Sequence, residues 1–145
     1  MKMSFGFSLV ELIIVIGLTI FLVGLTATVG TQTIRNAEFD RVRETVRTEL
    51  AAARADTIGG TLDSSWGVAF FSNALTRYRG TSYATRVTTY DHQTTFANGV
   101  TMTGTADVVL TRPYGLPLAP ATININDGVH SATITVNIAG AIDVQ

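Results

Sequence analysis

The chain has 145 residues, a formal net charge of −1 at pH 7 and no cysteine. This length fits one modest globular domain plus one additional element. The near-neutral charge provides no bulk attraction to nucleic acid or to an anionic membrane surface, and the lack of cysteine excludes disulfide bonds and thiolate metal sites.

The first predicted element is an apolar helix close to the N-terminus. No charged residue occurs from Leu12 through Ile34, a stretch longer than the roughly 20 residues that cross a hydrocarbon core of about 30 Å. Glu11 stands at the start of this run. A carboxylate at the centre of a membrane span costs about 2.5–3.5 kcal/mol, so ionisable residues in such segments are functional candidates by default.

Two ordinary explanations account poorly for this N-terminus. A secretory signal peptide has a shorter apolar core followed by a small-residue cleavage site. A plain membrane anchor agrees with the hydropathy but explains neither Glu11 nor the Gly6-Phe7 pair before the run. The string GFSLVELIIVIGL, residues 6–18, resembles instead the processing signal of type IV pilins and type II secretion pseudopilins.

The resemblance implies how this signal is used. Residues 1–6 would be a leader that a membrane-embedded prepilin peptidase removes by cutting between Gly6 and Phe7, after which Phe7 is N-methylated. Glu11 becomes the fifth residue of the mature chain, and we hypothesise that it pairs with the Phe7 amine of a neighbouring subunit. The alternatives for Glu11 are a position near the membrane interface or a role at its own helix N-terminus.

The resemblance and the basic Lys2 also predict a location. By the positive-inside rule, Lys2 keeps the N-terminus in the cytoplasm. The chain would then cross the bacterial inner membrane once, with its C-terminal domain on the outer side, before it enters a pilus or pseudopilus.

Residues 35–56 predict a continuation of the helix with an amphipathic pattern. Its apolar positions recur every three or four residues, as in a helix with one buried stripe: Phe39, Val42, Val46, Leu50 and Ala53. We expect a single helix from about Phe7 to Asp56, roughly 75 Å long, with Thr57-Ile58 as a frayed turn and Gly59-Gly60 as its end. The predicted regions are therefore 1–6 (leader), 7–34 (transmembrane and assembly half), 35–58 (amphipathic half) and 59–145 (β-rich domain).

Glycines in the apolar half leave two interpretations open. Gly17, Gly24 and Gly30 each lower helix propensity by about 1 kcal/mol relative to alanine. They could permit local melting in a filament, as the family resemblance implies, or close packing of helices in the bilayer.

The C-terminal part predicts antiparallel strands, and the fold class is α+β, with a long N-terminal helix packed against a β-sheet. Alternating runs rich in threonine and valine mark five strands, at 65–72, 82–90, 100–111, 121–126 and 130–139. Asp127-Gly128 lies between the last two runs and predicts a hairpin.

This domain also resembles the H-type minor pseudopilin and its minor-pilin relatives. The resemblance depends on an arginine at the helix end, a tryptophan in the first strand, an aromatic strand and later glycine and proline turns. The corresponding residues are Arg54, Trp66, Tyr78, Gly115, Pro117 and Gly140.

No catalytic or cofactor motif is found in the sequence. The two histidines, His92 and His130, are isolated from one another and predict no metal site, and Asp127 is interpreted as a turn residue. We therefore expect neither an enzyme nor a cofactor.

The predicted function is a structural subunit, of the minor type, of a type II secretion pseudopilus or a type IV pilus. Its partners would be other pilin or pseudopilin subunits, the prepilin peptidase and the assembly platform of the inner membrane. Three alternatives stay open: a major pilin, a simple membrane-anchored domain, or a DNA-binding minor pilin of natural transformation. The last would use arginines interleaved with tyrosines, Arg77, Arg79 and Arg86, although a solvated strand edge explains them better.

Overall fold

The computed structural model describes residues 8–96 and 99–145, without the side chains of 25–32. The chain divides into two compact units, Met1–Ala37 and Glu38–Gln145. The leader and Phe7 lie outside the described residues.

One helix, α1, runs from Leu9 to Ile58, so the predicted long helix is confirmed and extends two residues beyond Asp56. Its end is stabilised by the Gly59 N–H, which donates to the Ala55 carbonyl over 2.8 Å. Gly60 then adopts a left-handed backbone with φ 66°, which glycine does without the steric cost of a Cβ. The predicted fraying of Thr57 is wrong, because its buried hydroxyl donates to the Ala53 carbonyl and accepts the N–H of Trp66.

Among the residues that the structure describes, no helix combines the length and the apolar character needed to cross a membrane.

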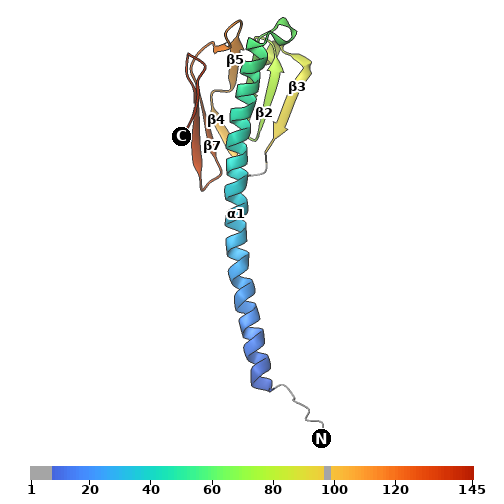
Figure 1. The fold of residues 1–145 in the computed structure, drawn as a ribbon, viewed down its shortest axis with the longest axis vertical. Coiled ribbons are helices and arrows are strands. Elements are labelled where there is room, and N and C mark those ends of the chain that lie inside the picture. Colours follow the sequence, from blue (N-terminus) through green and yellow to red (C-terminus); the bar gives the residue numbers. More distant parts are fainter. Residues whose placement is uncertain (1–7, 97–98) are drawn as a thin grey trace. The chain divides into compact units, whose positions relative to one another are not determined.

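Two antiparallel sheets make up the rest of the second unit (Figure 1). The first has the order β3-β2-β1-β5-β6 and the second the order β4-β7-β8-β9. The strands are β1 (Trp66–Phe70), β2 (Ala74–Arg79), β3 (Val87–Thr95), β4 (Thr101–Gly104), β5 (Asp107–Thr111), β6 (Leu116–Pro117), β7 (Ala121–Asn126), β8 (Ser131–Val136) and β9 (Ile142–Val144).

The C-terminal part of α1 covers the inner faces of both sheets. All five residues of the predicted stripe, Phe39, Val42, Val46, Leu50 and Ala53, are buried. They share one core with inner residues of the first sheet, such as Val68 and Leu110, and of the second, such as Ile123 and Ile134. The predicted α+β architecture of a helix packed on antiparallel sheet is therefore observed.

The strand predictions are only partly correct. The run 100–111 is not one strand, because the chain leaves the second sheet at Gly104 and enters the first at Asp107. Gly104 has φ 108°, and a Cβ there would lie 2.2 Å from the Thr122 carbonyl oxygen, so only glycine fits this bend. The run 82–90 begins with a 3-10 turn at Tyr83–Thr85 and becomes strand only at Val87. The alternating pattern did not predict strands β6 and β9, and β2 was indicated only by the resemblance, which placed Tyr78 in an aromatic strand.

The predicted hairpin is confirmed as β7–β8, with Ala121 opposite Val136 and Asn126 opposite Ser131. Its turn is longer than the two-residue signal suggests. The Asp127 carboxylate accepts the N–H groups of Val129 and His130, and the His130 carbonyl accepts the Asp127 N–H. Asp127 is thus the turn residue that the sequence predicted.

Candidate functional site

The first candidate site is the apolar segment of α1 from Leu9 to Val23. Each of its large hydrophobic side chains is between 51% and 74% exposed, and they surround the helix on all sides. A helix that is apolar all round is stable only when lipid or other protein covers it. Exposed apolar surface of this extent is typical of a segment that lipid or protein covers.

Glu11 lies in the first turn of this segment and is exposed. Ser8 directly precedes the helix, and its carbonyl accepts the Leu12 N–H over 3.2 Å. Ser8 and Glu11 therefore hold the N-cap and N3 positions, the spacing of a capping box in which serine and glutamate satisfy backbone N–H groups reciprocally. The alternative in which Glu11 acts at its own helix N-terminus is therefore specified as a capping box with Ser8. Ser8 was not singled out in the sequence analysis, although its S-x-x-E spacing relative to Glu11 could have revealed it.

The cleavage position cannot be placed in the same way, because Gly6 and Phe7 lie outside the described residues. Cleavage, methylation and the pairing of Glu11 remain predictions. Gly17 and Gly24 are helical, and an added Cβ on either would meet no atom within 4 Å. Their two interpretations, like that of Gly30, stay open.

The second candidate site, the arginine cluster, is divided between two faces of the first sheet. Arg77 lies on the helix side, where its Nε donates to Glu49 Oε2 over 2.9 Å and its Nη1 pairs with Asp56. The guanidinium also lies 5.7 Å from the centre of the Trp66 ring. Arg77 therefore fastens β2 to α1, which is a structural role.

Arg79 has the same orientation on β2, two residues further along. Its Nη2 donates to the Leu62 carbonyl over 3.0 Å, and its guanidinium lies 5.2 Å from the centre of the Tyr90 ring. It connects β2 and β3 to the turn that follows α1.

Arg86 belongs to a network on the outer face of the sheet. Its Nε donates to Asp91 Oδ2 over 2.7 Å, and this bond raises the pKa of the Arg86 guanidinium. The guanidinium also stacks on the Tyr83 ring, 3.7 Å from its centre. All three arginines are thus engaged within the domain, and they form no common basic surface.

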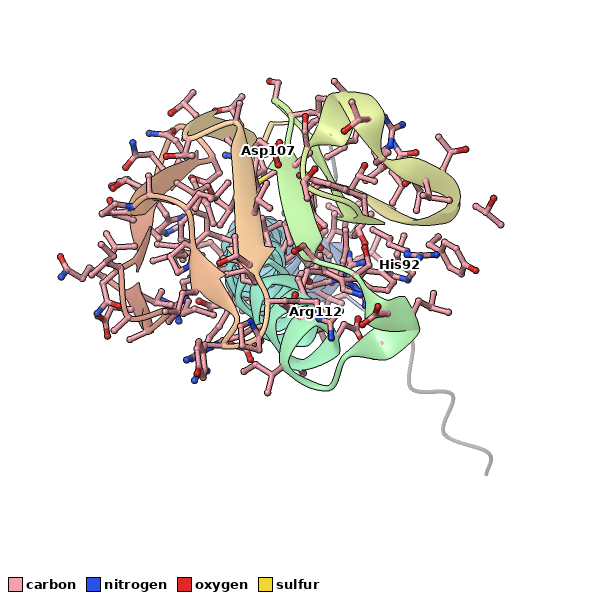
Figure 2. All side chains as sticks on the ribbon, turned by 90° about the horizontal axis from the view of Figure 1, so that it is seen from above. His92, Asp107 and Arg112 are labelled. Carbon is pink, nitrogen blue, oxygen red and sulfur yellow. The ribbon has the colours of Figure 1, made fainter. Side chains whose placement is uncertain are left out.

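Tyr78 and Asp107 stand at the centre of this outer network. The buried Tyr78 hydroxyl donates to Asp107 Oδ1 over 2.6 Å, and the Tyr83 N–H donates to Asp107 Oδ2 over 3.1 Å. Burial, and then the bond to the Asp107 carboxylate, raise the pKa of Tyr78 far above its ordinary value. Figure 2 shows Asp107 well apart from His92. The Nδ1 atom of His92 lies 3.2 Å from Oε1 of Glu49, the same carboxylate that accepts the hydrogen bond from Arg77.

Three residues of the H-type resemblance converge at the end of α1. Arg54 Nη1 donates to the Gly140 carbonyl over 2.8 Å, and its Nη2 donates to the Ala139 carbonyl over 3.3 Å. A Cβ on Gly115 would lie 2.9 Å from Arg54 Cγ, and Gly115 and Gly140 both have positive φ. The arginine therefore joins the helix end to two loops that must pass close to it.

The described residues contain no group of three or more histidine, cysteine or acidic residues placed to hold a metal ion. His130 lies at the β7–β8 turn, 3.0 Å from Asp127 through Nδ1. Hydrogen bonds from His130 and Val129 lower the pKa of Asp127 to about 2. This arrangement explains the turn without a ligand.

Comparison with solved structures finds a protein of the same fold, the minor pseudopilin EpsH from the type 2 secretion system of Vibrio cholerae. The TM-score is 0.57 at 14% sequence identity, and the alignment covers 74% of this chain and 96% of that chain. No protein-family model matches the chain, and no curated protein matches its sequence. The predicted pilin-like α+β fold is therefore confirmed.

Proposed function

We propose that this chain is a non-enzymatic structural subunit of a type II secretion pseudopilus or a type IV pilus, present as a minor component. The observation that carries the proposal is the combination of a pilin-like domain with a helical segment that is apolar all round and has one carboxylate in its first turn. Such a segment needs a covering partner. Lipid before assembly and the helices of neighbouring subunits afterwards both meet that need.

In this proposal the helix first anchors the subunit in the bacterial inner membrane, with the domain on the outer side. Prepilin peptidase cuts between Gly6 and Phe7 and methylates Phe7. The new amine and the Glu11 carboxylate of an adjacent subunit then pair, which compensates two charges that are costly in an apolar environment.

The arginine positions do not favour the DNA-binding alternative. Arg77, Arg79 and Arg86 each contact groups of their own domain, and they point to different faces of the sheet. A strand-binding surface needs cations that line one groove. Assembly as a structural subunit therefore remains the function that we propose.

The test of processing is mass spectrometry of the protein purified from cells with and without prepilin peptidase. We expect an N-terminus at methylated Phe7 in the first case and at Met1 in the second. An intact Met1 terminus in cells with an active peptidase would contradict the proposal.

The role of Glu11 is tested by two substitutions that separate its charge from its capping position. Glu11→Val removes both, whereas Glu11→Gln keeps a side chain that suits the N3 position of a capping box but removes the charge. We expect both variants to be cleaved and both to be excluded from fibres, as measured by immunoblots of sheared fibre fractions. Normal assembly of the Glu11→Gln variant would show that capping, and not pairing, is the role of this residue.

A further inference from the structure

The turn between β7 and β8 presents an apolar side chain to its surroundings. Val129 lies in this turn and is 69% exposed. The carboxylate of the neighbouring Asp127 is only 10% exposed, and its Oδ2 lies 3.0 Å from Nδ1 of His130. The turn therefore combines an exposed valine with a charge that is largely shielded from water.

The backbone N–H groups of this turn are already hydrogen-bonded within it. The Asn126 side-chain oxygen accepts the Gly128 N–H over 2.6 Å. Oδ1 of Asp127 accepts the N–H groups of Val129 and His130, and the His130 carbonyl accepts the Asp127 N–H over 3.2 Å. An unpaired N–H is costly in an apolar environment. The turn can therefore leave water without leaving these donors unsatisfied.

This turn lies at the end of the second unit where the chain enters from the apolar segment. The centre of the His130 ring is 5.3 Å from that of Phe39, and the unit begins at Glu38. The uncharged run of the sequence ends at Ile34. Five residue steps lead from Ile34 to Phe39, and a fully extended chain covers at most about 18 Å over them. Whatever the arrangement of the two units, the turn is thus held close to the end of the uncharged run.

We propose that the β7–β8 turn binds the surface of a lipid bilayer, with Val129 in the headgroup layer, while the apolar helix anchors the subunit. This inference rests on the membrane anchoring in the proposed function. Burial of an exposed valine favours the bound state of the turn by about five- to tenfold. The anchor has already met the entropic cost of bringing the turn to the membrane, so a contact of this strength is populated.

A second turn of similar construction lies at the other end of β8. Ile138 is also 69% exposed, and the Asn137 side-chain oxygen accepts the N–H groups of Ala139 and Ala141. The Ala139 carbonyl accepts a hydrogen bond from Arg54, near the end of α1. The six residues of β8 separate the two turns by about 20 Å. Ile138 is therefore a matched control that differs from Val129 in its distance from the apolar segment.

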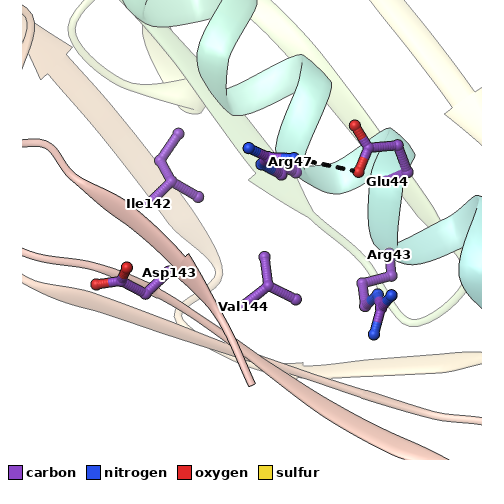
Figure 3. Close-up of a pocket in the computed structure, with 6 residues that line it drawn as sticks. All are labelled: Arg43, Glu44, Arg47, Ile142, Asp143 and Val144. Atoms are coloured by element: carbon purple, nitrogen blue, oxygen red, sulfur yellow. Dashed lines mark ion pairs between the residues drawn. The ribbon is translucent and has the colours of Figure 1, made fainter.

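The groove beside β9 provides no comparable argument (Figure 3). It has a volume of about 330 Å³, and its charged lining consists of Arg43 and Arg47 together with Glu44 and Asp143. Arg47 and Glu44 form an ion pair of 3.6 Å. The charges of the lining offset one another and indicate no ligand of either sign.

The test uses the full chain in phosphatidylcholine nanodiscs that hold one copy each, which excludes contacts between copies. The chain has no cysteine, so a fluorescent label can be attached through Val129→Cys, Ile138→Cys or, in the apolar segment, Ile16→Cys. Lipids with a nitroxide on the headgroup quench labels at the bilayer surface, and lipids with a nitroxide on the acyl chain quench labels in the hydrocarbon core. We expect headgroup quenching to be at least about twofold stronger at position 129 than at 138, since about 20 Å separates the two turns. Position 16 should be quenched from the acyl chains.

A second measurement keeps the label away from the valine. The label is attached through Ser131→Cys, an exposed position next to the turn. Val129→Glu should lower the headgroup quenching of this label about twofold, because the preference of the valine is lost and a charge is costly in an apolar layer. Ile138→Glu should leave the quenching unchanged. The fluorescence of the buried Trp66 verifies that each variant is folded.

The results separate this inference from the proposed function. Equal headgroup quenching at positions 129 and 138, or an unchanged signal in Val129→Glu, would overturn the binding of the turn, while acyl-chain quenching at position 16 would still support anchoring. No quenching at position 16 would contradict the anchoring itself and this inference with it.

Discussion

Replacing Gly67 by alanine is expected to destabilise the domain by about 2–4 kcal/mol, although glycine in a strand is usually a weak point. The Tyr78 ring lies across Gly67 on the outer face of the first sheet. A Cβ added to Gly67 would lie 2.6 Å from Tyr78 Cζ and 2.6 Å from its hydroxyl oxygen. Ordinary contacts begin near 3.4 Å, so the ring must move.

The magnitude has two parts. Overpacking a well-filled site costs about 1–3 kcal/mol. Displacing the ring also breaks the 2.6 Å bond from the Tyr78 hydroxyl to Asp107, and a hydrogen bond to a charged group contributes about 1.5–3 kcal/mol. Asp107 keeps the Tyr83 N–H and is partly exposed, so the sum is reduced to about 2–4 kcal/mol.

Urea unfolding followed by Trp66 fluorescence measures this change, because Trp66 is the sole tryptophan and is buried in the domain core. The control is the same substitution in a Tyr78→Leu background, where no ring lies over Gly67. There the cost should fall by at least about 1 kcal/mol, since contacting residues are not additive. A cost below about 0.5 kcal/mol, or full additivity in the double variant, would refute the proposed clash.

Two further predictions concern charged groups of the domain. Arg77→Met should cost about 2–3 kcal/mol in the same urea assay, because it leaves the half-buried carboxylates of Glu49 and Asp56 without their shared cation; an unchanged midpoint would contradict this role. Because the folded pKa of Asp127 is lowered to about 2, its contribution is complete above the unfolded pKa of about 3.9 and is lost as the pH falls toward 2. The wild type should therefore lose more stability between pH 5 and pH 2.5 than Asp127→Asn, and an equal loss in both proteins would refute this assignment.

Helical periodicity was the most informative feature of the sequence. The stripe from Phe39 to Ala53 is buried as predicted, because a repeat of three and four residues defines one helix face whatever covers it. The β7–β8 hairpin could also be predicted from the sequence, since two runs of alternating apolar and polar residues flank the Asp127-Gly128 turn signal. Local patterns suffice where local physics decides the structure.

The incorrect strand predictions occur where contacts between residues far apart in the sequence determine the structure. The run 100–111 alternates like one strand, yet the close approach of Gly104 to Thr122 divides it between two sheets. β2 was indicated by the resemblance through Tyr78 but not by the alternating pattern, and its arginines were interpreted as a solvated strand edge or a nucleic-acid contact. Their true partners, Glu49 and Asp56, lie on a helix far away in the sequence.

The candidate sites also differ in whether a local sequence pattern could predict them. The motif around Glu11 is local and was found, whereas the outer network joins Tyr78 to Asp107, a residue 29 positions further along the chain. No spacing rule connects positions so far apart. Arg54, Gly115 and Gly140 were noticed only through the resemblance, and their contact became visible in the structure.

The division of strands between the two sheets has a consequence for how the domain forms. The chain passes from one sheet to the other at β3–β4, β4–β5 and β6–β7, so neither sheet is a continuous piece of the polypeptide. A ribosome releases the N-terminal helix first and β9 last. Until β7, β8 and β9 arrive, the apolar stripe of α1 lacks the cover of Ile123 and Ile134. We therefore expect the core around this stripe to be completed only after β7 and β8 have been synthesised.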